Sequence, residues 1–152
     1  RELLLQAATE EAMSQDQDEI FEQHFHRPVL DRARQLGIRT ALGLACLYDT
    51  RIQGVLDIVA QAVQERLGVT AVGQSGPSGV GDEPTWLRTF LGEREAWLNR
   101  PADRREAENK PVDAQFLRTS TFRVRELRQL LQAGNLNLVG EFTVRGQRVQ
   151  GV

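Results

Sequence analysis

The chain has 152 residues, of which 40% are hydrophobic and 26% are charged, as is typical of a soluble globular protein. Its 19 lysines and arginines nearly balance 21 aspartates and glutamates, so the net charge of −2 gives no reason to expect a nucleic-acid partner. No apolar run approaches the roughly 18 residues that cross a bilayer, and the single cysteine excludes an intrachain disulfide. We therefore expect one monomeric domain over residues 1–152 with no membrane partner.

The N-terminal segment predicts two helices. Residues 2–25 carry apolar side chains at helical spacing, which indicates a long amphipathic helix. Pro28 is well placed to begin a second helix, and Gly37 is well placed to end it after Leu36. Because the chain begins with Arg1 and shows no signal-peptide pattern, we expect the parent protein to continue upstream.

Apolar residues recur at helical spacing throughout residues 38–67. The stripe consists of Leu42, Ala45, Cys46, Ile52, Leu56, Val59, Val63 and Leu67, with Asp49 in its middle. This pattern predicts a central buried helix that bends at most at Gly54. The next residues, 68–81, are rich in glycine, serine and proline and indicate a flexible loop. Their glycine spacing does not match a phosphate-binding loop.

The following segment predicts one more long helix. Either Asp82 or Glu83 can cap the helix that Pro84 opens, and this helix should stop near residues 100–101. Residues 100–113 are polar and contain prolines, so no helix is expected there.

The C-terminal segment predicts a last helix and a hairpin. The helix should run from about Phe122 to Gln132, with Gly134 as its terminator. Residues 142–149 alternate around a two-residue turn, which predicts a small hairpin within residues 139–152. The expected fold class is therefore mainly α with a small C-terminal β-hairpin.

Two charged residues lie on apolar helix faces. Asp49 belongs to the central stripe, and Arg94 is flanked at helical spacing by Phe90, Leu91, Trp97 and Leu98. An unpaired buried charge costs several kcal/mol or more, so these two residues are natural partners. Arg123, at the edge of the last helix's apolar face, can supply a second guanidinium. We therefore predict a buried ionic cluster of Asp49, Arg94 and Arg123.

The predicted cluster admits a catalytic and a structural interpretation. As a general acid or base, Asp49 would have to exchange a proton, but two arginines favour its charged form. We therefore favour a structural role that fixes the floor of a cleft. His24 and His26 have no nearby third ligand, so no metal site is predicted, and no motif predicts a cofactor.

Several segments, read in order, resemble the glycoside hydrolase family 46 chitosanases, a helical family with a two-lobed, lysozyme-like architecture. They are Phe25-His26-Arg27-Pro28, Ala41-Leu42-Gly43, Tyr48-Asp49, Gly81-Asp82-Glu83, Phe90-Leu91 with Arg94, and residues 133–138. The resemblance implies that the chain is the larger helical lobe and that Asp49, Arg94 and Arg123 form the family's ionic cluster. It also implies an amino-sugar polysaccharide partner, chitosan or a peptidoglycan-like polymer, and an extracellular or periplasmic location.

The resemblance further implies an endo-acting hydrolase of β-1,4 links that works with inversion, through a Glu general acid and an Asp that activates water. Both carboxylates lie upstream of the matched segments, so the catalytic residues of this chain are unknown. Tyr48, Gln53 and Asp103 fall at positions implied to bind substrate. Gln53-Gly54 replaces a histidine that is usual there, and Asp103 is the one plausible acid after the Arg94 helix. These departures keep a neutral or N-acetylated glycan open as the ligand.

Three hypotheses follow. The chain is part of an endo-acting glycoside hydrolase, in which it supports the cleft and binds glycan; it is a non-catalytic glycan-binding module; or it is a helical interaction domain. Under the first hypothesis the isolated chain should bind amino-sugar oligomers but should not hydrolyse them. Trp86 or Tyr48 can offer an apolar surface for binding, although aromatic residues at such positions are more often part of the core.

Overall fold

The computed structural model describes residues 11–76, 79–144 and 146–151. The elements in chain order are α2 (Glu11–Phe21), the π-helix η1 (Glu22–His26), α3 (Arg27–Leu36), α4 (Ala41–Ile52), α5 (Leu56–Leu67), β1 (Ser75–Gly76), β2 (Gly79–Val80), α6 (Glu83–Ala107), α7 (Pro111–Arg118), the 3-10 helix η2 (Thr119–Thr121), α8 (Phe122–Gln132), β3 (Glu141–Val144) and β4 (Gln147–Gln150). The predicted class, mainly α with a small C-terminal hairpin, is confirmed.

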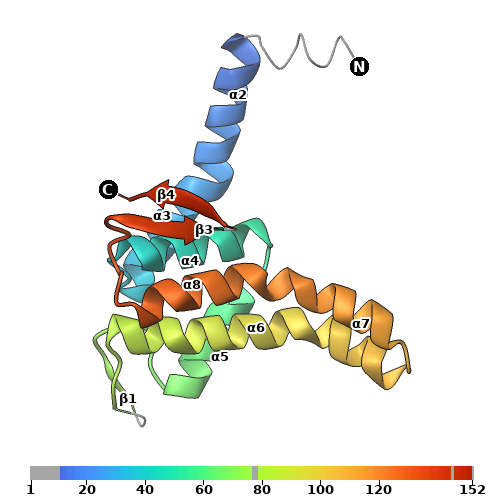
Figure 1. The fold of residues 1–152 in the computed structure, drawn as a ribbon. Coiled ribbons are helices and arrows are strands. Elements are labelled where there is room, and N and C mark those ends of the chain that lie inside the picture. Colours follow the sequence, from blue (N-terminus) through green and yellow to red (C-terminus); the bar gives the residue numbers. More distant parts are fainter. Residues whose placement is uncertain (1–10, 77–78, 145, 152) are drawn as a thin grey trace.

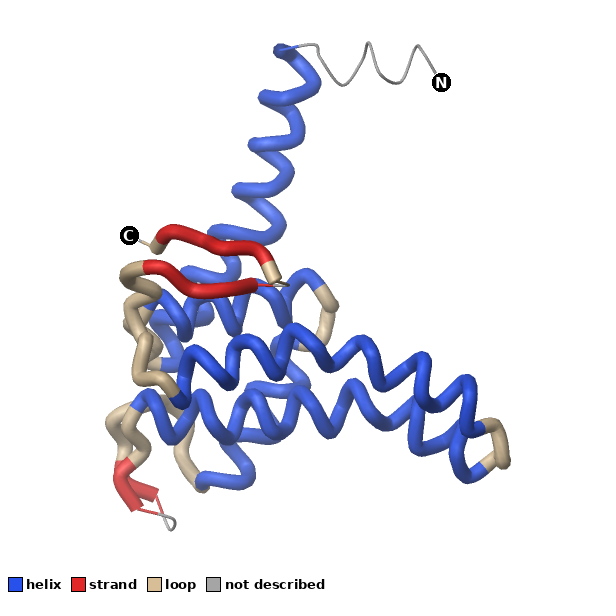
Figure 2. The backbone as a smooth tube through the Cα atoms, viewed as in Figure 1, coloured by secondary structure: helices blue, strands red, loops and turns tan. Residues whose placement is uncertain are grey.

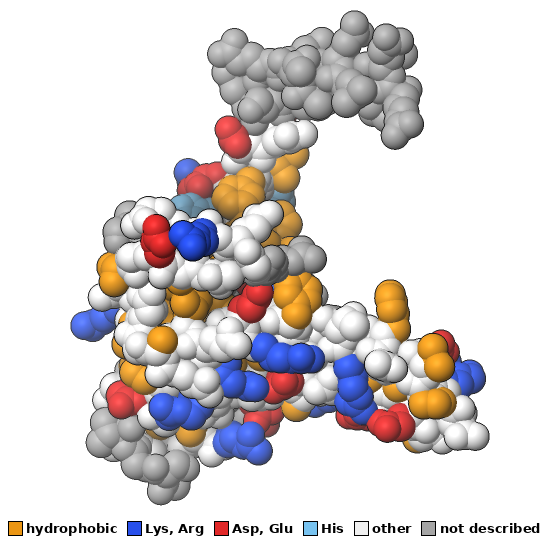
Figure 3. All heavy atoms as spheres, viewed as in Figure 1, with side chains coloured by type: hydrophobic (Ala, Val, Ile, Leu, Met, Phe, Trp, Pro, Cys, Tyr) orange, Lys and Arg blue, Asp and Glu red, His pale blue; other side chains and the backbone are white. Residues whose placement is uncertain are grey.

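The helices pack around a shared apolar core, and two segments extend away from it (Figure 1). α3, α4, α5, α6 and α8 contribute the core side chains, whose largest buried members are Trp86, Phe90, Leu36, Leu42, Leu47, Leu87 and Leu91. α2 stands clear of the body at one end, while α7 folds back on the far end of α6 (Figure 2). Apolar side chains are visible where α2 meets the body and on the α6–α7 arm (Figure 3).

The helix predicted to begin at Pro28 and end after Leu36 is confirmed as α3, but it follows α2 and η1 without a break. α2 passes through the π-helical turn η1 directly into α3, and Pro28 occupies the first turn of α3. The π-helical turn, in which the regular α-helical hydrogen-bond pattern is interrupted, lies just before this proline. Gly37 ends α3 as predicted, with a left-handed φ of 72°. The predicted helix at residues 2–10 lies outside the described residues.

The predicted central helix over residues 38–67 is two helices. α4 ends at Ile52 and α5 begins at Leu56, because Gly54 between them adopts a left-handed φ of 75°. The apolar periodicity placed Ile52 on the buried stripe. In the structure Ile52 is the last residue of α4, next to the break, and it is 48% exposed.

Residues 68–81 include a short antiparallel pair, which the loop prediction missed. Ser75 pairs with Val80 and Gly76 with Gly79, and the Gly73 N–H donates to the Gly81 carbonyl at 2.7 Å. These backbone bonds join residues 73–76 to residues 79–81, just before α6 begins.

α6 does not stop at residues 100–101 but continues through Pro101 to Ala107. A proline inside a helix costs about 3 kcal/mol, because it removes one backbone hydrogen bond and its ring crowds the preceding turn. Ala102 is fully buried where α6 packs against α7, and Ala114 of α7 is 3% exposed. The packing of α6 against α7 offsets the free-energy cost of the proline. The sequence pattern did not predict α7 as a helix.

The C-terminal elements follow the prediction closely. α8 spans Phe122–Gln132, Gly134 beyond it has a φ of 70°, and β3 pairs with β4 so that Phe142 faces Val149. The Leu42 N–H donates to the Leu136 carbonyl at 2.8 Å, which fixes the tail to the start of α4. Among the described residues, no helix combines the length and apolar character needed to cross a membrane.

Candidate functional site

The start of α4, the helix that presents the site, is held by side chains from two parts of the chain. Thr40 caps the helix by accepting a hydrogen bond from the Gly43 N–H at 3.1 Å. Glu83 accepts bonds from the N–H groups of Arg39 and Thr40 at 2.9 and 3.0 Å. A Cβ at position 43 would lie 2.5 Å from Ile38 Cγ2 and 2.6 Å from Glu83 Oε1, so a larger residue there would displace these side chains. Sequence reasoning considered Glu83 only as a cap for α6, a role that Asp82 takes.

The structure brings Asp49, Arg94 and Arg123 together and adds Gln53 to them. Arg94 donates through Nη2 to Asp49 Oδ2, and through Nε and Nη2 to Gln53 Oε1 at 3.2 and 2.9 Å. Arg123 donates through Nη1 to Asp49 Oδ1 at 2.8 Å. Each carboxylate oxygen of Asp49 therefore meets a different guanidinium, one from α6 and one from α8.

The cluster is buried on one side only, which corrects the expectation of full burial. The side chain of Arg94 is 0% exposed, that of Asp49 is 21% exposed and that of Arg123 is 43% exposed. Arg123 lies at the outer edge of α8, so water screens its ion pair, whereas the Arg94 pair is shielded by the core. Within the described part of the chain, Arg94 Nη1 has no hydrogen-bond partner.

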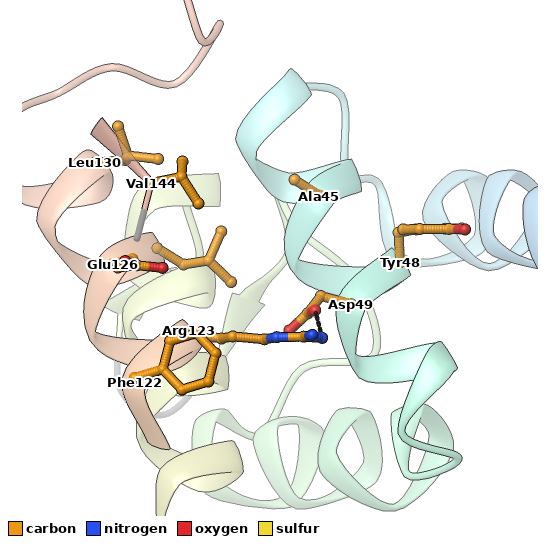
Figure 4. A pocket seen from close by; sticks show the side chains of 9 residues that line it. Ala45, Tyr48, Asp49, Phe122, Arg123, Glu126, Leu130 and Val144 are labelled. Carbon is orange, nitrogen blue, oxygen red and sulfur yellow. Dashed lines mark hydrogen bonds and ion pairs between the residues drawn. The ribbon is translucent and has the colours of Figure 1, made fainter. Parts of the chain in front are cut away.

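Asp49 and Arg123 line a surface hollow of about 380 Å³ between α4, α8 and β3. Its walls are formed by Ala45, Tyr48, Asp49, Phe122, Arg123, Glu126, Leu127, Leu130 and Val144 (Figure 4). The Arg123 guanidinium carbon lies 5.7 Å from the centre of the Phe122 ring, a cation–π arrangement that steadies the side chain. The sequence pattern did not indicate the residues of α8 and β3 that complete this hollow, because only tertiary packing places β3 beside α4.

Tyr48 joins this hollow to a second one. Its side chain points away from Arg123 (Figure 4), and its ring lies 5.6 Å from that of Phe21. Tyr48 and Ala45 also line a smaller hollow of about 220 Å³ beside His26, Val29, Leu30 and Leu44. Tyr48 is therefore positioned between two adjoining surface hollows.

Two residues expected at a ligand surface lie elsewhere. Asp103, near the end of α6, pairs with Arg118 Nη1 at 3.0 Å and does not line the hollow beside Asp49. Trp86 is 0% exposed and cannot contact a ligand, so the core alternative holds for this residue. Its burial follows from its position in the first turns of α6, which face the core. In the described ranges, no group of three or more His, Cys, Asp or Glu side chains is arranged to hold a metal ion.

The geometry favours binding over proton transfer at Asp49. Both carboxylate oxygens already accept charged hydrogen bonds, so taking a proton from water would require Asp49 to give up an ion pair. The partly exposed Arg123, by contrast, has donor groups directed toward a concave surface with apolar walls, a combination that suits the hydroxyl groups and apolar faces of a sugar.

The family profile of glycosyl hydrolase family 46 matches residues 2–141. The chain belongs to this family. The resemblance inferred from the sequence motifs is therefore confirmed. A chitosanase of Bacillus subtilis (strain 168) is 33% identical over 132 residues, which cover 85% of this chain and 44% of the relative.

Solved structures of family 46 chitosanases share the fold of this chain. A chitosanase of Gynuella sunshinyii in complex with chitotetraose and the native chitosanase of Bacillus subtilis MY002 each align with a TM-score of 0.72 and 26% identity. A mutant of the latter, complexed with 6 GlcN, aligns equally well. Each alignment covers 95% of this chain and 58% of the other. The family 46 chain thus spans about half the length of the relatives it matches.

Proposed function

We propose that the protein to which this chain belongs is an endo-acting glycoside hydrolase that cleaves β-1,4 links of an amino-sugar polymer such as chitosan. The observation that carries the proposal is the family 46 match over residues 2–141. Relatives with the same fold include chitosanases complexed with chitotetraose and with 6 GlcN, which supports an amino-sugar polymer as the substrate class.

Within that protein, this chain supports the cleft and binds glycan but does not by itself catalyse hydrolysis. Inverting cleavage needs a protonated and an ionised carboxyl group roughly 6.5–9.5 Å apart across the scissile bond. Of the described residues, the hollow beside α4 presents two carboxyl groups, those of Asp49 and Glu126. Asp49 is held by two guanidinium groups, so it suits neither the proton donor nor the base.

Binding through the hollow is tested by NMR titration of the isolated chain with chitotetraose, beside a reducing-sugar assay. Tyr48→Ala should weaken binding about fivefold, because it removes the aromatic side chain between the two hollows. Phe116→Ala is the matched control, since Phe116 is an aromatic residue that is 76% exposed on α7, away from the hollow. We expect no release of reducing ends.

The outcomes separate the alternatives. Efficient hydrolysis by the chain alone would show that it contains a catalytic pair. Glycan binding by a full-length protein that has no activity would favour a non-catalytic glycan- or peptidoglycan-binding module. Absence of binding to any amino-sugar oligomer would favour a helical interaction domain. We also propose an extracellular or periplasmic location, which the resemblance to the family 46 chitosanases implies. Cell fractionation with an antibody against the chain tests this.

A further inference from the structure

The arm formed by the end of α6 and by α7 leaves two large apolar side chains open to solvent. Val112 is 78% exposed and Phe116 is 76% exposed, more than any other large apolar side chain of the described residues. They are four positions apart, so they lie on the same face of α7. The arm extends away from the body, which leaves this face accessible (Figure 1). A paired apolar exposure of this kind marks a surface for contact with another molecule.

Val112 and Phe116 line a hollow of about 410 Å³ beside α7. The other lining residues are Leu117 and two residues of opposite charge, Arg105 near the end of α6 and Asp113 in the first turn of α7. The arm therefore presents apolar projections next to an apolar recess, with one basic and one acidic residue at its edge. Associating helices pack in this way, since the side chains of one fit into the spaces between those of another.

The two charged residues of the hollow retain the capacity for further ion pairs. Asp113 forms no ion pair with any residue that the structure describes. Arg105 donates through Nη1 to Glu108 at 2.9 Å, but its side chain is 45% exposed. A guanidinium group has five N–H donors, so Arg105 can bind a second carboxylate.

The overall charge of the arm disfavours a strongly charged partner. Lys110 pairs with Glu108 at 3.3 Å and Arg118 pairs with Glu106 at 2.5 Å, so charges of both signs are interspersed. A nucleic acid requires a basic surface and a protonated amino-sugar polymer an acidic one, whereas two copies of a neutral surface do not repel each other. Residues 101–118 contain four basic and four acidic residues, namely Arg104, Arg105, Lys110 and Arg118, and Asp103, Glu106, Glu108 and Asp113.

We propose that this face of the arm is a dimer interface, at which a second copy of the chain packs its Val112 and Phe116 against the hollow. A two-fold axis brings Arg105 of each copy to Asp113 of the other, so the same ion pair forms twice. The surface is thus complementary to itself. Because the contact is small, the dimer should be weak, with a Kd on the order of 10 μM. The monomer expected from the sequence is then the state of dilute solution, and the inference is independent of the proposed glycosidase activity.

Charge exchange between copies provides the sharpest test. Arg105→Glu places two carboxylates opposite each other at both contacts, and Asp113→Arg places two guanidinium groups there, so each variant alone should be monomeric. In an equimolar mixture of the two variants, each contact again joins opposite charges, and the dimer should return. Neither residue lines the hollow beside Asp49. Sedimentation equilibrium over the micromolar range measures association, and circular dichroism checks that each variant is folded.

The apolar contribution is tested separately. Phe116→Ala should raise the Kd of the dimer at least about tenfold, because truncation of an aromatic residue at the centre of an interface is costly. Ile20→Ala is the control, since Ile20 is an apolar side chain that is 55% exposed on α2, and it should leave the Kd unchanged. If the charged variants do not fold, the concentration dependence of the α7 amide resonances in the unmodified chain makes the same distinction.

Several outcomes would overturn the proposal while leaving the glycosidase proposal intact. They are a chain that stays monomeric throughout the micromolar range, a mixture that dimerises no better than the single variants, and a dimer that is lost in Ile20→Ala but kept in Phe116→Ala. The same series is measured on the whole protein to which the chain belongs. A dimer formed by the chain but not by that protein would mean that another part of the protein covers the arm, which would also overturn the inference.

Discussion

The guanidinium of Arg94 on α6 donates a hydrogen bond through Nη2 to Oδ2 of Asp49 on α4, from a side chain that is 0% exposed. The two residues are 45 positions apart, and their pairing joins two core helices. A buried charge is costly when its partner is removed. Substitution of either residue of this pair should therefore lower the free energy of unfolding more than substitution of an exposed ion pair does.

Asp49→Ala should lower the free energy of unfolding by about 3 kcal/mol, since it leaves the buried Arg94 guanidinium with Gln53 as its one remaining partner among the described residues. Asp103→Ala is the control and should cost about 0.5 kcal/mol or less, because its pair with Arg118 is exposed. Urea unfolding followed by circular dichroism measures both. Equal midpoints for the two variants would contradict the assignment of Asp49.

The two arginines of the cluster should differ in their tolerance of lysine. Arg94→Lys should destabilise by about 2 kcal/mol, because a single ammonium group cannot reproduce the bonds that Nε and Nη2 make to Gln53 and Asp49. Arg123→Lys should cost about 0.5 kcal/mol, since the side chain is 43% exposed and makes one bond to Asp49. Thermal melts at equal ionic strength compare them, and a larger loss for Arg123→Lys would be inconsistent with the geometry.

Pro101→Ala should stabilise the chain by about 1–2 kcal/mol. Alanine at this exposed position inside α6 restores a backbone donor and removes the ring clash, although it also gives more freedom to the unfolded chain. Pro111→Ala is the matched control, because Pro111 lies in the first turn of α7, where a proline is favourable. Urea midpoints for both variants test this, and a stabilisation of similar size in Pro111→Ala would argue against the mechanism.

Cys46 should be unreactive in the folded chain. Burial raises the pKa of its thiol to about 12, so almost no thiolate is present at pH 8. Ellman's reagent should therefore label Cys46 only after the chain is unfolded in denaturant. Since the folded pKa lies above the unfolded one, the neutral thiol contributes stability that is complete below pH ~8.5 and declines as the pH rises toward 12. Cys46→Ala should remove this part of the alkaline decline.

Local sequence patterns were sufficient for elements whose signals lie within the element itself. Gly37 and Gly134 mark helix ends where a left-handed residue is needed, and the cap of α6 was narrowed to Asp82 or Glu83, of which Asp82 takes the role. These preferences come from a few neighbouring backbone groups. Local patterns failed at Gly54, where apolar periodicity continues through a break, and at Pro101, where a helix continues through a proline. At Pro101 the packing of α6 against α7 overrides the local preference, whereas at Gly54 the conformational freedom of glycine ends a helix that the apolar periodicity would continue.

The same division applies to the candidate site. Asp49 and Arg94 lie on apolar helix faces, and Arg123 lies at the edge of one. These positions predicted that Asp49 pairs with both arginines, because an unpaired buried charge is costly, and the structure contains both ion pairs. The sequence could not indicate that Gln53 completes the coordination of Arg94 or that Phe122 and Val144 enclose one hollow. These features depend on the positions of side chains from α4, α6, α8 and β3 relative to one another. Only the tertiary structure decides them, because amphipathic periodicity specifies which face of a helix is buried but not which side chains of another element it meets.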